Sequence, residues 1–429
     1  MLHYDTVIFD LDGTVFDTEE GLLSSHRYIL QKQGYAVPSD DTLRRFIGPS
    51  LQDSLTWYCA MNHEQIVRYV AEYRPYYIEH GWKKTRLYPG IRALMHQLKK
   101  QGAHIYVATG KPIQTVEKLL KRFYLAGYVE DVAAPDALDV SMDKEAFIHR
   151  LLDGKGSRKA VMIGDIASDI TGARAAGVDA VGVSYGYGGP DAFKDVQPCR
   201  VASDAWELAS LLMDEPLPQK GYFITIEGLD GCGKTTQSDA VAWELAAQGY
   251  TVRRTREPGG CPISEKIRDL LLDRENAAMT DITEALLYAA SRAQHVRQVI
   301  RPAMERGEIV LCDRFVDSSV AFQGGGRQLG VGLIERINEP AVGDCAPDAT
   351  VYLRLDHETA LRRRENASAL DRIESEKASF HARVEAAYDQ LAANHANRFI
   401  AVDARNTPEQ ITAEIMDALL ERMFAAEVL

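Results

Sequence analysis

Short apolar runs recur along the chain, and each is followed by a turn and a longer stretch with helical periodicity. Strands that alternate with helices in this way predict parallel sheets covered by helices. We therefore expect an α/β fold with two doubly wound parallel-sheet domains. The predicted strands are 6–9, 105–108, 160–163 and 180–183 in the first half, and 223–226, 251–255, 309–311, 350–355 and 398–402 in the second.

The boundary between the halves is predicted at residues 214–220, DEPLPQK. Two prolines among charged residues stop the preceding helix and indicate a short, stiff linker. The alternation of predicted strands and helices begins again after this linker, so we expect domains at 1–213 and 221–429. Residues 16–87 interrupt the first domain with a helical stretch. An insertion there would lie over the carboxyl ends of the strands, where such sheets bind ligands, which indicates a cap. A helical domain that only stabilises the fold is the alternative.

Composition narrows the classes of partner. The chain has 429 residues, of which 46% are hydrophobic and 26% charged, and 49 basic against 62 acidic residues give a net charge of −13. This acidic balance argues against nucleic-acid or membrane-surface binding, but it is compatible with small anionic ligands. The six cysteines lack zinc-ligand spacing and indicate reduced thiols. With no signal peptide and no apolar run of membrane-spanning length, we expect a soluble, cytoplasmic protein.

Two aspartates follow the first predicted strand directly, in the segment FDLDGT at 9–14. Asp10 and Asp12 are two residues apart, so they point the same way from an extended chain. Two converging carboxylates need a cation between them, and Mg²⁺ suits oxygen ligands and phosphate. One carboxylate could attack phosphorus, and the other could protonate the leaving oxygen and later activate water. A calcium loop is the alternative, but EF-hand spacing is absent.

Three later segments of the first half supply groups of the same chemistry. Thr109 and Gly110 end another predicted strand and suit phosphate oxygens, and Lys144 supplies a balancing cation. Asp165 ends a third predicted strand, with Asp169 one helical turn beyond.

This ordered set of motifs resembles the haloacid dehalogenase superfamily of phosphatases over residues 4–213. The resemblance implies Asp10 as nucleophile, Asp12 as general acid and base, and Thr109 and Lys144 as phosphate ligands. It implies that Asp10, Asp165 and the Asp12 carbonyl bind Mg²⁺, with support from Asp169. The segments 46–51 and 109–112 look like the subgroup of phosphoglycolate phosphatases and 5′-nucleotidases.

The second half opens with a strand, the segment GLDGCGKT at 228–235 and a helical stretch. This is the pattern of a phosphate-binding loop, whose backbone N–H groups surround a phosphate at a helix N-terminus. Lys234 is expected to reach the β- and γ-phosphates of ATP and Thr235 to bind Mg²⁺. The predicted phosphate-binding residues are Gly228, Asp230, Gly231, Cys232, Gly233, Lys234, Thr235 and Thr236.

Five further segments occur in order: TREPGG at 255–260, LYAASRAQ at 287–294, CDR at 312–314, DSSVAFQGGG at 317–326 and LDRIE at 370–374. Together with the loop they closely resemble bacterial thymidylate kinase over residues 221–429. The resemblance implies a P-loop nucleoside-monophosphate kinase fold, ATP as phosphoryl donor, dTMP as acceptor, and a homodimer.

The family's dTMP contacts transfer onto matching residues. Asp230 would meet the 3′-hydroxyl, and Tyr288 would stack on thymine. Ser319 and Gln323 would read the base edge, and Asp313 would hold Mg²⁺ or its waters. The resemblance further implies that the dTMP phosphate is bound by Arg268, Arg292 and Arg314, with Arg314 near the transferring group.

The catalytic arginine of the lid is expected among Arg362, Arg363 and Arg364, since the loop itself contains no arginine. We favour Arg363 or Arg364, and the alternative is a solvated helix face. Phe315 replaces the tyrosine that usually follows the Asp-Arg pair in this family.

These features predict a bifunctional enzyme, a Mg²⁺-dependent phosphatase fused to a dTMP kinase, with no nucleic-acid partner. The phosphatase substrate stays open between a nucleoside monophosphate and phosphoglycolate. Two other functions are alternatives. The first half could be a module that senses a phosphorylated metabolite and regulates the kinase, or the second half could phosphorylate a different nucleotide.

Overall fold

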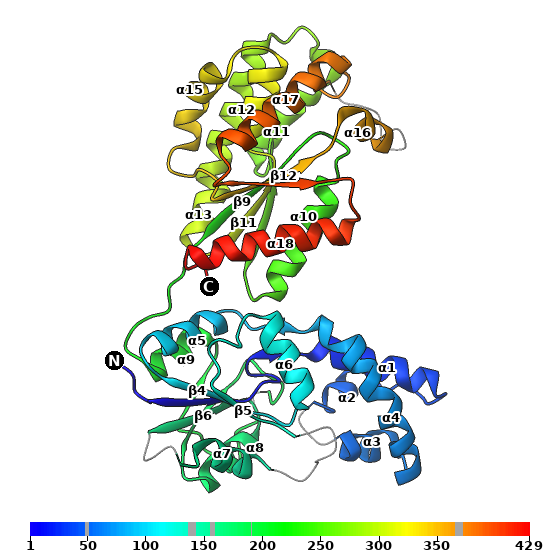
Figure 1. The fold of residues 1–429 in the computed structure, drawn as a ribbon, viewed down its shortest axis with the longest axis vertical. Helices are drawn as coiled ribbons and strands as arrows, with labels where there is room; N and C mark the ends of the chain where they lie inside the picture. The colour runs from blue at the N-terminus through cyan, green and yellow to red at the C-terminus, as the bar shows by residue number, and fades with distance from the viewer. Residues whose placement is uncertain (48–50, 136–142, 155–158, 190, 365–371) are drawn as a thin grey trace. The chain divides into compact units, whose positions relative to one another are not determined.

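The computed structural model describes the chain except for residues 48–50, 136–142, 155–158, 190 and 365–371, and the side chain of Arg364. The chain forms two compact units, residues 1–218 with 247–249 and residues 219–246 with 250–429 (Figure 1). Each unit contains one parallel sheet with helices against it, which confirms the predicted fold class.

The first unit is built on a six-stranded sheet in the order β5-β4-β1-β6-β7-β8, with every pair parallel. The strands are β1 (Thr6–Phe9), β4 (His104–Ala108), β5 (Asp131–Ala133), β6 (Ala160–Gly164), β7 (Asp179–Val183) and β8 (Arg200–Ala202). Two edge strands, β5 and β8, were missed from the sequence because each has only three residues and polar positions at its start.

Helices cover both faces of this sheet because its central strands are apolar on both sides. Ile8 and Met162 pack against Phe147 of α7 (Lys144–Leu152) and Ile170 of α8 (Ala167–Ala175). Helices α5 (Ile91–Lys100) and α9 (Ala205–Leu212) lie on the opposite side (Figure 1). Helix α6 (Ile113–Arg122) follows β4.

The inserted stretch is helical and has a core of its own. It consists of α1 (Glu19–Lys32), α2 (Asp40–Arg44), α3 (Leu51–Cys59), α4 (His63–Glu79) and the 3₁₀ turn η1 (Gly81–Lys84). An antiparallel pair, β2 (Phe16–Asp17) and β3 (Arg86–Leu87), connects it to the sheet domain. Tyr69, Tyr73 and Tyr77 lie four residues apart on α4, so they share one buried face of that helix.

The second unit contains a five-stranded parallel sheet in the order β10-β11-β9-β12-β13. Its strands are β9 (Tyr222–Glu227), β10 (Val252–Arg256), β11 (Ile309–Asp313), β12 (Ala349–Arg354) and β13 (Phe399–Asp403). Alternate residues face opposite sides. Ile224 packs in the large cluster that includes Val241 and Ile415, whereas Phe223 packs against Ile300 and Phe315.

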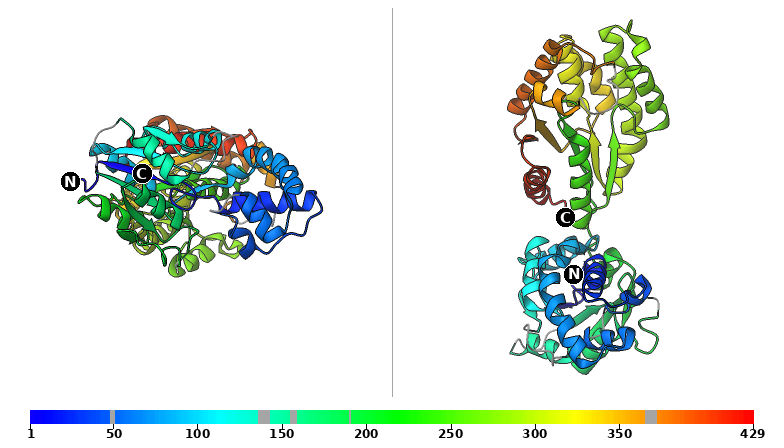
Figure 2. Two further views of the ribbon diagram at one scale, coloured as in Figure 1. Left: turned by 90° about the horizontal axis from the view of Figure 1, so that it is seen from below. Right: turned by 90° about the vertical axis from the view of Figure 1, so that its right-hand side faces the viewer.

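The helices of the second unit surround this sheet (Figures 1 and 2). They are α10 (Lys234–Ala247), α11 (Pro262–Leu272), α12 (Asp281–His295), α13 (Arg301–Glu305), α14 (Val316–Ser319), α15 (Val331–Val342), α16 (His357–Arg364), α17 (Ala378–Asn394) and α18 (Pro408–Ala425). The unit also contains a 3₁₀ turn, η2 (Arg274–Asn276), and two π-helical segments, η3 (Val296–Ile300) and η4 (Val320–Gly326). Among the described helices, none is long and apolar enough to cross a membrane.

Candidate active sites

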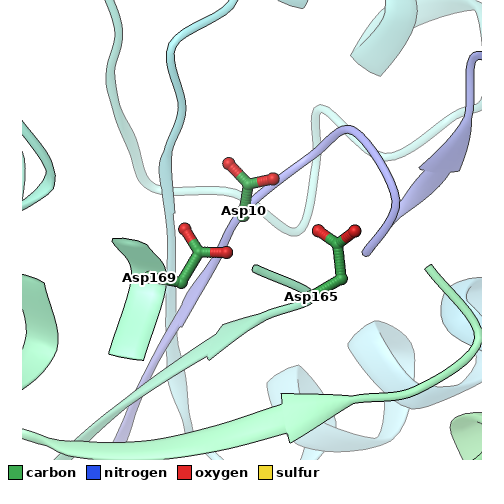
Figure 3. A group of neighbouring side chains, drawn as sticks. All are labelled: Asp10, Asp165 and Asp169. Carbon is green, nitrogen blue, oxygen red and sulfur yellow. The ribbon is translucent and has the colours of Figure 1, made fainter. Parts of the chain in front are cut away.

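Three buried carboxylates meet at the carboxyl end of the first sheet. Asp10 follows β1, Asp165 follows β6 and Asp169 lies in the first turn of α8. Their nearest carboxylate oxygens all lie within 4.8 Å of one another. Figure 3 shows the three side chains together: Asp10 and Asp165 project from the chain just beyond their strands, and Asp169 from the start of a helix. Parallel strands bring their carboxyl ends to one edge, so residues 155 positions apart in the sequence become neighbours.

Lys144 lies against this group. Its Nζ is 2.8 Å from Asp10 Oδ1 and 2.8 Å from Asp169 Oδ1, and it donates to the carbonyl of Ala108 at 2.9 Å. The lysine starts α7, which Asp143 caps by accepting from the backbone N–H of Ala146. One ammonium group thus faces two of the carboxylates, and its role as the cation that balances a nucleophile stays a prediction.

The backbone around Asp165 holds its carboxylate in place. Thr14 donates to Oδ1 at 3.3 Å, and the N–H groups of Tyr187 and Gly188 donate to Oδ2 at 2.7 and 3.3 Å. Gly13 passes close by with a φ of +81°, and a Cβ at this position would lie 2.3 Å from Asp165 Oδ2. The loop therefore requires glycine for conformation and for space.

The electrostatics of this group favour a bound cation. Burial raises the pKa of Asp10 to about 8, aided by Asp169 and Asp165 and opposed by Lys144. Burial and Asp169 likewise raise the pKa of Asp165 to about 7. Carboxylates that are costly to ionise next to one another fit a divalent ion with oxygen ligands. The Asp12 side chain lies outside this group of three, and its expected metal contact was through the backbone carbonyl.

Asp12 instead pairs with a lysine that the sequence analysis did not assign. Lys111 Nζ lies 3.1 Å from Asp12 Oδ2 and donates to the hydroxyl of Tyr77, on cap helix α4, at 3.2 Å. Asp12 Oδ1 is buried and has no hydrogen-bond partner among the described residues. Thr109 is buried and accepts from the backbone N–H of Lys111, whereas Gly110 is exposed. The position of Lys111, two residues after Thr109, was the available signal.

The second unit contains a cavity of about 600 Å³ at the carboxyl ends of its strands. Most of the predicted phosphate and substrate residues line it, although they come from many separate segments. Those lining residues are Asp230, Gly231, Gly233, Lys234, Thr235, Thr236, Arg268, Tyr288, Arg292, Asp313, Arg314, Ser319 and Gln323. Gly228 and Cys232 are not part of the lining, and Cys232 is buried.

A charged cluster occupies the loop end of this cavity. Lys234 donates to the carbonyls of Gly228 and Leu229 at 3.3 and 2.9 Å and contacts Asp230 Oδ1 at 3.2 Å. Arg314 Nη2 lies 2.6 Å from the same oxygen. Despite burial, Arg314 and Lys234 hold the pKa of Asp230 well below its usual range. Two cations on one carboxylate leave net positive charge where a polyphosphate is expected.

Arg292 is placed differently from the expectation that it binds phosphate. The side chain is 1% exposed. It donates to Glu257 at 2.8 Å, to Ser319 at 3.1 Å and to the carbonyl of Phe315 at 2.9 Å. It also donates to Asn338. Four of its N–H groups are thus engaged within the protein, and a direct phosphate contact stays a prediction.

Comparisons with known proteins agree with this geometry. Residues 226–415 match the family model described as thymidylate kinase, and residues 7–183 match the one described as haloacid dehalogenase-like hydrolase. The chain is 47% identical over 209 residues to thymidylate kinase from Geobacter sp. (strain M21), covering 47% of this chain and 93% of that protein. It is also 47% identical to thymidylate kinase from Enterococcus faecalis over 206 residues, 97% of that protein.

The chain belongs to the thymidylate kinase family. Together, the two family matches show a haloacid dehalogenase-like domain fused to a thymidylate kinase domain, as the motifs predict. Among solved structures, the chain is similar to a predicted phosphatase from Clostridium acetobutylicum, with 31% identity and a TM-score of 0.46. That likeness covers 48% of this chain and 97% of the other.

The remaining predicted residues of the thymidylate kinase domain are placed as follows. Arg268 lines the cavity and donates to the carbonyl of Pro258 at 2.8 Å. Asp313 Oδ1 is buried without a hydrogen-bond partner among the described residues, which fits a role in holding Mg²⁺.

The expected lid arginines lie on α16. Arg362 and Arg363 are exposed there, and Arg363 donates to the carbonyl of Ala404 at 2.9 Å. The side chain of Arg364 and residues 370–371 of LDRIE lie outside the described residues, as do 48–50 of the cap segment 46–51.

Sequence reasoning missed the buried carboxylates of the thymidylate kinase domain. Glu227, at the end of β9, accepts from the N–H of Phe315 at 2.7 Å and from the hydroxyls of Ser318 and Tyr388 at 2.6 and 2.8 Å. Burial and Asp317 raise the pKa of Glu227 to about 7. Its place directly before the phosphate-binding loop was the signal. Glu284 of α12 was also missed.

Proposed function

We propose that the thymidylate kinase domain transfers the γ-phosphate of ATP to dTMP, giving dTDP. The observation that supports this most is the single cavity lined both by the phosphate-binding loop and by the residues expected to hold dTMP. Phosphoryl transfer depends on positioning and on charge stabilisation, and one cavity can align both nucleotides.

In this reaction Lys234 contacts the β- and γ-phosphates, and Arg314 stabilises the charge of the transferring group. Asp230 orients the deoxyribose through its 3′-hydroxyl, Tyr288 stacks on the base, and Arg268 binds the dTMP phosphate. Arg363 or Arg364 supplies the lid cation. Thr235 and Asp313 would hold Mg²⁺, which neutralises phosphate charge when bound.

The test of this activity is ADP formation by the full chain with ATP, Mg²⁺ and a panel of nucleoside monophosphates. We expect dTMP to be the preferred acceptor. Preference for dGMP, or no transfer to any nucleotide, would contradict the assignment. Lys234→Ala should remove ADP formation, and thermal unfolding of this variant shows whether it is folded.

We propose that the haloacid dehalogenase-like domain hydrolyses a small phosphomonoester through Asp10. An Asp10 oxygen forms a bond to phosphorus while the bond from phosphorus to the leaving oxygen breaks, and Asp12 gives its proton to that oxygen. Asp12 then takes a proton from water as the water oxygen attacks phosphorus, which releases phosphate and restores Asp10. Lys144 and Thr109 hold the phosphoryl oxygens.

Mg²⁺ suits the carboxylates of Asp10 and Asp165 and the carbonyl of Asp12, with Asp169 beside them. When bound, it offsets negative charge on carboxylate and phosphate. The support is the buried group of three carboxylates against one lysine.

The substrate we propose is a nucleoside monophosphate, because the domain is fused to a nucleotide kinase. The test is phosphate release by the Lys234→Ala chain with nucleoside monophosphates, 2-phosphoglycolate and sugar phosphates. Cleavage of deoxynucleotides supports the proposal, whereas cleavage of phosphoglycolate alone contradicts it. No release from any compound would instead favour a regulatory role.

We further propose a cytoplasmic homodimer. Helices α11 and α12, which line the dTMP end of the cavity, expose apolar side chains that a second copy would cover. These are Ile263, Leu270, Ile282 and Leu286. Light scattering of the purified chain tests the state, and Leu286→Glu should shift it to monomer.

A further inference from the structure

We propose that Glu284 is a positioning residue that decides which pyrimidine edge the kinase cavity accepts, through the orientation of the Gln323 amide. This inference rests on the proposed dTMP kinase activity and extends it to a residue that does not line the cavity. It starts from the buried surroundings of Glu284.

Glu284 lies on α12, is 1% exposed, and faces donors on both carboxylate oxygens. Gln323 Nε2 donates to Oε1 at 2.9 Å. On the other oxygen, Arg327 Nη2 lies at 3.1 Å and Arg372 Nη2 at 2.7 Å. A carboxylate between two guanidinium groups accepts hydrogen bonds and donates none.

This acceptor fixes the orientation of the Gln323 side chain. An amide has an NH₂ end and a C=O end, and either end can face a neutral partner. Against a carboxylate only the NH₂ end forms a hydrogen bond, because the C=O end would be repelled. Gln323 lines the cavity, so its carbonyl oxygen is the acceptor left for the base.

A second contact from the same helix orients Ser319. Arg292 Nη1 donates to Ser319 Oγ at 3.1 Å, which leaves the hydroxyl hydrogen free to donate to a ligand. Glu284 and Arg292 are eight residues apart, with Tyr288 between them, so they lie on one face of α12. This face therefore presents one donor, Ser319, and one acceptor, Gln323.

The donor and acceptor match one class of pyrimidine. A 4-oxo pyrimidine such as thymine or uracil carries an acceptor at O4 beside a donor at N3–H. Cytosine has the reverse, an amino donor at C4 and an acceptor at N3. The Gln323 amide, held in one orientation, rejects the reversed pattern, because its carbonyl oxygen would face the N3 acceptor of cytosine and lose its hydrogen-bond donor.

The test compares the full-length wild type with Glu284→Gln, measuring ADP formation with dTMP and with dCMP. A glutamine at this position can offer its own C=O or NH₂, so Gln323 is free to turn over. We expect the dTMP-over-dCMP preference in kcat/KM to fall about tenfold or more. The change should lie in KM for dTMP, with kcat at saturating dTMP within about threefold of wild type.

Glu376→Gln is the matched control, because Glu376 also contacts Arg327 but has no hydrogen bond to Gln323 among those described. It should keep the wild-type preference. Glu284→Asp is a second variant in case Glu284→Gln does not fold. It keeps the charge beside Arg327 and Arg372 but withdraws the carboxylate from Gln323, so the preference should also fall. Thermal unfolding of each variant shows whether it is folded.

The outcomes separate this inference from the proposed function. A wild type that phosphorylates no dTMP contradicts both. A wild type that prefers dTMP, with the same preference in Glu284→Gln and Glu284→Asp, overturns only the role of Glu284. An equal loss in Glu376→Gln also overturns it, because charge near Arg327 would then be the cause. Equal use of dTMP and dCMP by the wild type overturns the inference as well.

Discussion

The buried Lys111 forms an ion pair with the half-buried Asp12, its Nζ lying 3.1 Å from Asp12 Oδ2, and the same ammonium group donates to Tyr77 of the cap. Burial opposes the charge on Lys111, yet Asp12 and Tyr77 raise its pKa above the usual range. The lysine therefore stays charged and holds the expected acid–base group in one orientation next to the cap.

Replacement of Lys111 by methionine should lower kcat for phosphate release about tenfold or more, since Asp12 loses the contact that orients it. The loss should be larger for alkyl phosphates than for p-nitrophenyl phosphate, whose leaving oxygen needs no proton. Lys99→Met, which removes a surface lysine paired with Glu130, is the control and should leave kcat unchanged. An equal loss for both substrates would contradict a role through Asp12.

Gly13→Ala should lower phosphate release about a hundredfold or more, because its Cβ would displace the Asp165 carboxylate. Gly34→Ala is a matched control. Gly34 has a similar φ of +76°, but a Cβ there meets no atom within 4 Å. Both substitutions carry about 1 kcal/mol of backbone strain, so only the contact with Asp165 differs. Equal phosphate release by the two variants would contradict the steric argument.

The free energy of unfolding of the cap should depend on pH through the buried side chain of His26. This side chain is buried, stacks on Tyr73 with ring centroids 4.4 Å apart and contacts the Tyr69 hydroxyl at 2.8 Å. Burial lowers its pKa to about 3, below the unfolded value of 6.5. Between these values the unfolded cap binds the extra proton, so the free energy of unfolding falls as pH falls, by about 1.4 kcal/mol per pH unit.

Hydrogen exchange of α1 and α4 between pH 7 and pH 4 measures this dependence, after correction for the intrinsic exchange rate. His26→Gln should flatten it. His63→Gln, on the exposed surface of the same cap, should keep it. The same pH dependence in all three proteins would assign it to other groups.

A substitution in one active site should remove the activity of that site and leave the other activity unchanged. Asp10→Asn should lower phosphate release at least about 10³-fold and leave dTDP formation intact, because it removes the nucleophile of the first domain alone. Lys234→Ala should do the reverse. The retained activity shows that the unchanged domain is intact in each variant, and thermal unfolding shows whether the substituted domain is folded. Unchanged phosphate release by Asp10→Asn would favour the regulatory-module alternative.

The sequence predicted the strands of the second sheet and the central strands of the first closely, but missed the two edge strands of the first sheet. Central strands such as β1 and β9 are buried on both faces, so their apolar runs stand out. The edge strands β5 and β8 are short and partly polar, and their pairing partners lie far away in the sequence. Motifs that precede a helix or follow a strand, such as those around Asp10 and Lys234, were located from local spacing alone.

What the sequence by itself determined is the order of two α/β domains and the motifs at their strand ends that are expected to carry the chemistry, because periodicity, glycine spacing and strand ends are local properties. Tertiary structure alone decided the buried pairings: Lys111 with Asp12, Glu284 with Gln323, and Arg292 with Glu257. A buried polar group must find a partner, and that partner is whichever side chain a distant element places beside it. The partner of such a group therefore cannot be predicted from spacing along the chain.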